Sequence, residues 1–341
     1  MQVMSAYFEI TNLCNLNCIT CYNRSGLNRC RKELSVAQLS QIIARLSSEF
    51  ECTTFSFAGG EPLLHSELSE LLNYTQSHPE FKFSFVTNGT VHKEAFFHAI
   101  QSNPAQYRVQ ISLDGSSEEI NALTRGKGSF SRTIQFIKRL TDFSFRPAIK
   151  MVVSQNNLTD IEPFFRLAVD LNCMPVFDFV ACNGNASDSW DSINPTPRQK
   201  VQVLKLIDRL NKEFPDFQTE LPRNNFTCSL TKPNGPVSAL IKTDGTIFPC
   251  QMLYENIHAC GNILTDSTGF IVSKIDELRQ LAITRLTQDY NCKRCPMQHG
   301  CARGCFASAY YLTGDSLGDD GNCMTRKLEF FDFDLKAMQQ N

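Results

Sequence analysis

Along the first two thirds of the chain, segments with a strand-like pattern of apolar residues alternate with segments that have a helix-like pattern. Short apolar runs such as AYFEIT at 6–11 predict strands. The segment SVAQLSQIIARLSSEF at 35–50 instead repeats apolar residues at helical spacing, and Ser35 stands where an N-cap belongs. Because strand and helix patterns keep alternating, we expect a parallel sheet with helices outside it.

The same reasoning divides the chain into elements. Strands are expected at 6–11, 53–60, 82–89, 107–115, 148–154 and 175–180, and helices at 35–50, 66–77, 93–101, 131–143, 160–171 and 194–214. Six strands fit an open, partial TIM-like barrel of (β/α)6 type better than a full eight-stranded barrel. Beyond PDFQTELPRNNFT at 215–227 the pattern changes to short strands, turns and cysteines. We therefore expect a barrel domain at 1–215 and a small cysteine-rich domain at 216–341.

Net charge and targeting signals limit the binding partners and the cellular location that can be expected. The net charge is −2, and 20% of residues are charged, so no strong field points to nucleic acid or to an anionic membrane. The chain has no run of 18 apolar residues, and its start lacks the pattern of a signal peptide. These features predict a cytoplasmic protein.

The 15 cysteines change this ordinary picture. Three of them, Cys14, Cys18 and Cys21, stand in CNLNCITC, and many of the others lie between Cys228 and Cys323. In a reducing compartment such groups favour metal or redox chemistry over disulfides. Three thiolates can hold a [4Fe–4S] cluster and leave one iron open to a ligand, whereas a zinc site completed by a distant ligand is the alternative.

Further polar motifs follow the expected strands. They are Gly59–Pro62, Thr87–Gly89 and Ser112–Asp114, each at the carboxyl end of a strand. Functional loops of parallel βα folds lie at this edge. The cysteine loop and the three motifs are therefore expected to form one site.

In this order, the motifs resemble those of the radical S-adenosylmethionine (SAM) superfamily, whose signature is CxxxCxxC followed by an aromatic residue such as Tyr22. The resemblance implies a SAM-binding [4Fe–4S] cluster on Cys14, Cys18 and Cys21. It also implies cofactor contacts from Gly59, Gly60, Glu61, Pro62, Asn88, Ser112, Asp114 and Arg125. The implied chemistry is reductive cleavage of SAM to a 5′-deoxyadenosyl radical, which abstracts a hydrogen atom from the substrate.

The second cysteine field resembles the SPASM extension of the same superfamily. By position, Cys292, Cys295, Cys301 and Cys323 would hold one auxiliary [4Fe–4S] cluster, and Cys228, Cys250 and Cys305 would hold another. The second set is one ligand short, so either Cys260 completes it or one iron stays open. A zinc ribbon is the alternative for these short spacings.

Three residues are candidates for catalysis. Cys182 follows the sixth strand, and it or Cys260 could return a hydrogen atom to a substrate radical, as an epimerase requires. Asp178 lies in an otherwise apolar strand and could face the cavity, although a capped or solvent-facing carboxylate is the plainer interpretation. Cys52 and Cys173 are expected to be buried structural thiols.

Enzymes that resemble this chain act mainly on peptides and proteins. We expect a maturase of a ribosomally made peptide that forms a thioether or carbon–carbon crosslink, with a peptide epimerase or a small-molecule dehydrogenase or epimerase as alternatives. Sulfatase maturation is disfavoured because Gln251 stands where that group has an aspartate. Cys14 leaves no room before it for a leader-binding module, so a separate leader-binding protein is expected, with a flavodoxin or ferredoxin as reductant. A non-catalytic iron–sulfur electron carrier is a third class, which the motif at Gly59–Pro62 argues against.

Overall fold

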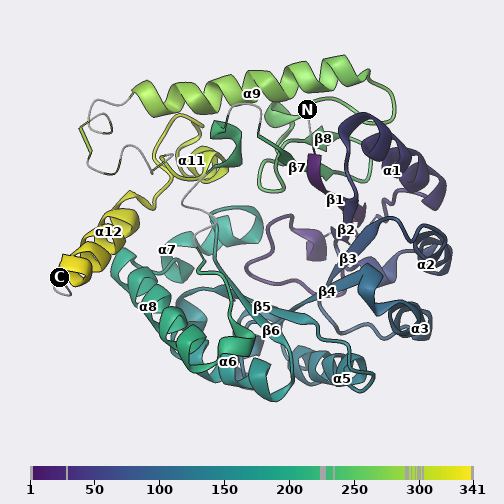
Figure 1. The fold of residues 1–341 in the computed structure, drawn as a ribbon, viewed down its shortest axis with the longest axis horizontal. Coiled ribbons are helices and arrows are strands. Elements are labelled where there is room, and N and C mark those ends of the chain that lie inside the picture. The colour runs from purple at the N-terminus through teal and green to yellow at the C-terminus, as the bar shows by residue number, and fades with distance from the viewer. Residues whose placement is uncertain are drawn as a thin grey trace.

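The computed structural model describes residues 3–27, 30–222, 228–232, 235–288, 292, 294, 295, 297, 301 and 303–338. Its centre is an eight-stranded sheet with helices around it (Figure 1). The strands are β1 (Val3–Thr11), β2 (Thr54–Gly59), β3 (Lys82–Thr87), β4 (Tyr107–Ser112), β5 (Ala148–Val153), β6 (Met174–Phe179), β7 (Val237–Ile241) and β8 (Ile247–Phe248).

Helices connect the strands in the order that the sequence predicts. They are α1 (Val36–Phe50), α2 (Leu68–Ser77), α3 (Glu94–Ser102), α4 (Glu118–Arg125), α5 (Ser129–Thr141), α6 (Ile161–Asp170), α7 (Trp190–Ile193) and α8 (Pro197–Glu213). The later part of the chain adds α9 (Thr268–Gln288), α11 (Phe306–Thr313) and α12 (Cys323–Met338). In Figure 1, α9 lies along one side of the molecule, and α12 lies beside α8.

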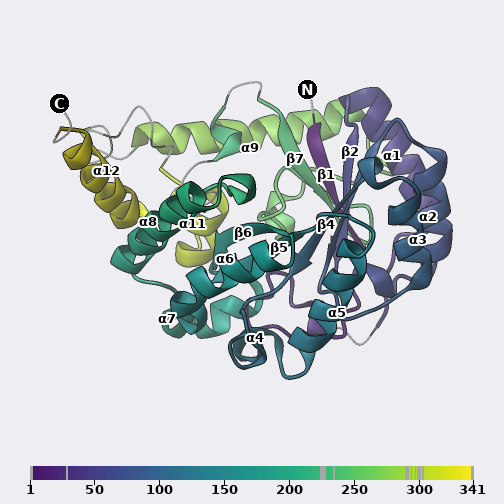
Figure 2. The same ribbon diagram turned by 60° about the horizontal axis from the view of Figure 1, so that its bottom comes forward.

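The sheet order is β6-β5-β4-β3-β2-β1-β7-β8, and β1 to β6 pair in parallel between neighbours. The six strands of the expected barrel are therefore confirmed. The sheet also continues past β1, which the sequence pattern does not predict. There β7 pairs in parallel with β1, from Val3↔Val237 to Phe8↔Ile241, so both parts of the chain share one sheet (Figure 2). The boundary between 215 and 216 stays a prediction, and residues 223–227 of that segment lie outside the described residues.

The two faces of the sheet differ in polarity because successive side chains point to opposite sides. Buried phenylalanines cover the face under the helices, and the rings of Phe57 and Phe83 stack with centroids 5.7 Å apart. The opposite face carries the polar alternates of the same strands, including Gln110, Ser112 and Lys150, all partly buried. The polar face is therefore the one whose side chains can form hydrogen bonds with a ligand.

One helix near the site was not expected. Helix α4 begins after Ser117, whose hydroxyl accepts a hydrogen bond from the Ile120 amide. Its buried residues are Asn121 and Thr124, so the helix has no apolar stripe for a periodicity argument to detect. Among the described residues, no helix is long and apolar enough to cross a membrane.

Candidate active site

The three-cysteine loop leaves the carboxyl end of β1, as expected. Cys14, Cys18 and Cys21 are each partly buried. Burial raises the pKa of the Cys14 thiol to about 12, and negative charge on Cys18 and Cys21 adds to this effect. The three thiols therefore lie within electrostatic range of one another.

The loop is held against the end of β2. The Gly60 amide donates to the Thr11 carbonyl at 2.8 Å, and the Glu61 amide donates to the Leu13 carbonyl at 2.8 Å. A Cβ atom on Gly60 would lie 2.0 Å from the Leu13 carbonyl oxygen. Glycine is needed here because the two backbones touch.

Glu61 supports the site from inside the protein. Its side chain is fully buried and accepts hydrogen bonds from the Leu63 amide (3.1 Å), the Thr87 hydroxyl (2.7 Å) and the Asn88 amide (2.8 Å). The carboxylate thus joins the end of β2 to the end of β3. Its direct contact with a cofactor ammonium stays a prediction, as do the cofactor contacts of Gly59, Gly60 and Pro62.

Replacing Glu61 by glutamine is expected to change how stability depends on pH. Burial raises the pKa of Glu61 from 4.5 to about 7, against the lowering effect of its hydrogen bonds. The unfolded chain therefore ionises this group first, and Glu61 destabilises the fold as the pH rises from about 4.5 to about 7. A pKa difference of about 2.5 corresponds to about 3 kcal/mol. Relative to Glu61→Gln, the wild type should lose this much unfolding free energy over that interval, measured by urea titration at matched pH. A difference between the two proteins that is independent of pH would contradict the assignment.

Asn88 lies beside the cysteine loop and Ser112 lies at the end of β4, and their cofactor contacts stay predictions. Asn88 donates to the Asn15 side chain at 3.0 Å, its Nδ2 lies 3.9 Å from the Cys14 sulfur, and its Oδ1 accepts from the Thr90 amide. Ser112 ends β4 and is in register with Lys150 of β5 on the polar face. Both side chains are therefore beside the cysteine loop or on the adjoining interior wall.

The loop after β6 also holds the cysteine loop, and sequence reasoning missed it. The Asn185 amide donates to the Cys21 carbonyl at 2.8 Å, and its side chain donates to the Cys18 carbonyl at 2.8 Å. Gly184 has φ of +56°, and a Cβ there would lie 2.1 Å from the Cys21 carbonyl oxygen. The string NGN at 183–185 was the available signal, because Asn and Gly favour such turns.

Two of the catalytic candidates lie on or near β6. Asp178 forms an ion pair with Lys150 of β5, and each side chain is about one quarter exposed. It is therefore a paired carboxylate on the polar face. Cys182 is buried just beyond the carboxyl end of β6, where burial and then nearby Asp191 raise its pKa. Their catalytic roles stay predictions.

A second group of thiols gathers in the later part of the chain. Burial raises the pKa of Cys250 to about 12, and the neighbouring Cys305 and Cys228 add to the effect. Cys228, Cys250 and Cys305 therefore lie within electrostatic range of one another. Cys260 is fully buried, and its sulfur lies 3.7 Å from the His258 carbonyl oxygen. Burial raises its pKa to about 12, and Glu277 and Lys274 are the charged neighbours that affect it. Ligation of a cluster by the three thiols, and its completion by Cys260, stay predictions.

Cys301 and Cys323 form part of a third group. Negative charge on Cys301 raises the pKa of Cys323, after the larger effect of burial. Arg326 lies beside both and forms a buried two-pronged ion pair with Asp320 at 2.7 and 2.8 Å. Of the other two predicted ligands, the Cys295 amide donates to the Cys292 carbonyl at 3.2 Å.

Three tyrosine rings in contact connect the cysteine loop to α11. Tyr22, next to Cys21, has its ring centroid 6.3 Å from that of Tyr254, which stacks on Tyr311 at 5.4 Å. The Tyr254 hydroxyl accepts from the Gly184 amide at 2.9 Å. Aromatic packing thus joins the cysteine loop, the β6 loop and α11, which begins directly after Cys305.

These surroundings fit iron–sulfur ligation by the first group. The Leu16 amide lies 3.5 Å from the Cys14 sulfur, and N–H groups of Asn88 and Arg125 each lie 3.9 Å from a cysteine sulfur. N–H donors directed at ligand sulfurs are a common feature of iron–sulfur sites, where they tune the potential. Arg125 also forms an ion pair with Asp114 at 2.9 Å.

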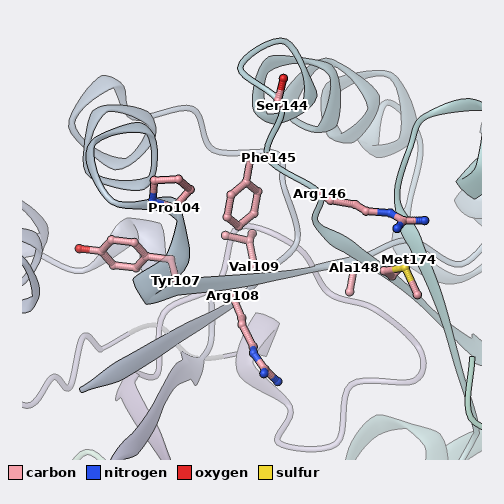
Figure 3. Close-up of a pocket in the computed structure, with 9 residues that line it drawn as sticks. All are labelled: Pro104, Tyr107, Arg108, Val109, Ser144, Phe145, Arg146, Ala148 and Met174. Atoms are coloured by element: carbon pink, nitrogen blue, oxygen red, sulfur yellow. The ribbon is translucent and has the colours of Figure 1, made fainter. Parts of the chain in front are cut away.

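A separate pocket of about 440 Å³ lies at the opposite edge of the sheet (Figure 3). Tyr107, Ala148 and Met174, which line it, are the first residues of β4, β5 and β6. The ring of Phe145 points toward Val109 across it. Because it is at the amino ends of the strands, this pocket is not part of the candidate active site.

Comparisons with known proteins agree with the geometry. The radical SAM superfamily profile matches residues 8–168. The mycofactocin maturase MftC of Mycolicibacterium smegmatis is 31% identical over 328 residues, which cover 93% of this chain and 81% of the relative.

The structure of anSMEcpe with bound AdoMet superposes with a TM-score of 0.78 at 20% identity, covering 99% of this chain and 98% of the other. Streptococcus suis SuiB bound to the precursor peptide SuiA gives a TM-score of 0.74 at 16% identity, covering 94% and 75%. The two solved structures confirm the predicted fold.

Proposed function

We propose that this chain, which belongs to the radical SAM superfamily, makes a crosslink in a ribosomally made peptide. Enzymes of this superfamily bind SAM and a [4Fe–4S] cluster. The observation that carries the proposal is the match, over 93% of this chain, to a relative named as a maturase. A solved neighbour that holds a precursor peptide is consistent with it.

The cysteine loop and its supports form the cofactor end of the site. When bound, the reduced cluster supplies the electron that cleaves SAM to a 5′-deoxyadenosyl radical, which takes a hydrogen atom from the peptide. Cys14, Cys18 and Cys21 hold the cluster, and the backbone of 59–62 binds the methionine ammonium. The side chains assigned to the rest of SAM are those of Asn88, Ser112, Asp114 and Arg125.

Closing a crosslink removes two hydrogens from the peptide. The first leaves as a hydrogen atom, and the second leaves as a proton and an electron. An auxiliary cluster would accept that electron, and Cys228, Cys250 and Cys305 are residues that would hold such a cluster. Asp178, on the polar face of the sheet beside Lys150, is the carboxylate that we assign to the proton.

Two partners and a location complete the proposal. A flavodoxin or ferredoxin supplies the electrons, and a separate protein presents the leader of the peptide. We place the reaction in the cytoplasm, because reduced thiols and low-potential clusters persist in reducing compartments.

The test uses the short peptide encoded nearest the gene. It is incubated without oxygen with the reconstituted enzyme, SAM and reductant in heavy water, and then fragmented in a mass spectrometer. Loss of two hydrogens at one pair of residues is the expected result. Gain of one deuterium would replace the crosslink by epimerisation, and Cys182→Ser would then abolish that gain if Cys182 is the donor. An unchanged peptide with 5′-deoxyadenosine still released would reject the peptide substrate and favour a small molecule.

A further inference from the structure

A buried cation lies beside one of the three loop cysteines. Arg125 is the last residue of α4, and its side chain is only 10% exposed. Its Nη1 lies 3.9 Å from the Cys18 sulfur, and its Nε lies 2.9 Å from Oδ2 of Asp114. An arginine guanidinium keeps its proton in proteins. A positive charge therefore lies where this side chain meets the Cys18 sulfur.

Asp114 is fixed by three different elements. Its side chain is fully buried, and Oδ1 accepts from the Val152 amide of β5 at 2.8 Å. Its own amide donates to Asn121 of α4 at 2.9 Å, and its carbonyl accepts from Asn157 at 3.0 Å. The position of the carboxylate is therefore set by the rest of the fold, and the carboxylate in turn fixes the position of the Arg125 side chain.

Backbone next to Cys18 is hydrogen-bonded to α4, the helix that carries Arg125. The Ile19 amide, next to Cys18, donates to the Thr124 carbonyl at 3.1 Å, one residue before Arg125. The Asn185 side chain holds the Cys18 carbonyl from the other side. Both the sulfur and the cation therefore have little freedom to separate.

We propose that the Asp114–Arg125 pair sets the reduction potential of the iron–sulfur cluster bound through Cys18. Charge and N–H donors at ligand sulfurs raise the potential, because they stabilise the extra electron of the reduced cluster. Arg125 acts here as a tuning and positioning residue, and Asp114 limits the effect of its charge. This inference rests on the proposed ligation by Cys14, Cys18 and Cys21, but not on the identity of the substrate.

The test is a potentiometric titration of the reconstituted enzyme without peptide, followed by electron paramagnetic resonance. The signal that Cys14→Ala lacks identifies the cluster of the three-cysteine loop and separates it from the auxiliary signals, without requiring a variant to bind SAM. Arg125→Gln removes the charge, and we expect it to make reduction about tenfold less favourable, which is 59 mV for one electron. Arg125→Lys keeps the charge and should shift the potential less. Arg139→Gln removes an exposed arginine paired with Glu94 and should leave the potential unchanged.

Asp114→Asn provides a test of sign. If the pair acts through charge, this variant raises the potential while Arg125→Gln lowers it. Shifts in the same direction, a shift below twofold in Arg125→Gln, or loss of the loop-cluster signal itself in both Arg125 variants would overturn the proposal in favour of a structural role. Because no peptide is present, failure of the proposed peptide reaction leaves this result unaffected.

Discussion

Replacing Cys14 by alanine is expected to abolish release of 5′-deoxyadenosine from SAM. Cys14 is one of three thiols grouped at the carboxyl end of β1, and its sulfur receives N–H groups from Leu16 and Asn88. Losing an outer-shell partner of a metal ligand costs 10- to 100-fold, so losing the ligand itself should cost more than about 100-fold. The measurement is chromatography of SAM cleavage products, with iron content determined on the same sample.

Two other cysteines show whether the effect is specific. Cys30 is exposed, and Cys30→Ala should retain iron content and SAM cleavage. Cys250→Ala should lose auxiliary iron and peptide modification but keep SAM cleavage. Retention of SAM cleavage in Cys14→Ala would rule out the assigned cluster site.

Replacing Gly60 by alanine is expected to lower the free energy of unfolding by about 3–5 kcal/mol. The new methyl group would lie 2.0 Å from the Leu13 carbonyl oxygen and 2.4 Å from its carbon. Both atoms belong to the backbone, so the strand end and the cysteine loop must separate. The hydrogen bonds from Gly60 to Thr11 and from Glu61 to Leu13 would then be strained or lost. Urea unfolding followed by the fluorescence of Trp190, the single tryptophan, measures the change.

Gly269→Ala is the matched control. Its Cβ would meet nothing within 4 Å, and Gly269 lies near the start of α9. Alanine there should leave stability unchanged or raise it by up to about 1 kcal/mol. Equal stability of Gly60→Ala and the wild type would mean that the β2 end and the cysteine loop are not in contact.

The parallel sheet was predictable because apolar residues recur at every second position in its strands and at helical spacing in its helices. Residues such as Phe83 and Phe85 alternate with polar neighbours in β3, and the predicted helices follow β1 to β6 in the predicted order. The pairing of β7 with β1 was not predictable in this way. It joins segments more than 200 residues apart, and a strand pattern does not specify its partner.

The candidate site was predictable only as far as its motifs. Strand ends indicated where the cysteine loop, Asn88 and Asp114 would lie. The end of a strand does not determine where a side chain points. The sequence therefore could not indicate that Glu61 points into the protein, or that the Asn185 side chain donates a hydrogen bond to the Cys18 carbonyl. Spacing also allowed Cys260 as a ligand, but it could not indicate that this thiol is fully buried.

The pairing of β7 with β1 also protects the sheet. Without β7, the outer backbone groups of β1 would form an open edge, and such an edge is a template for association between copies of a chain. Ile241 lies beside Phe8 at this seam, so the uncovered strand would expose apolar surface as well. The cysteine-rich part therefore also keeps the barrel strands from pairing with other molecules.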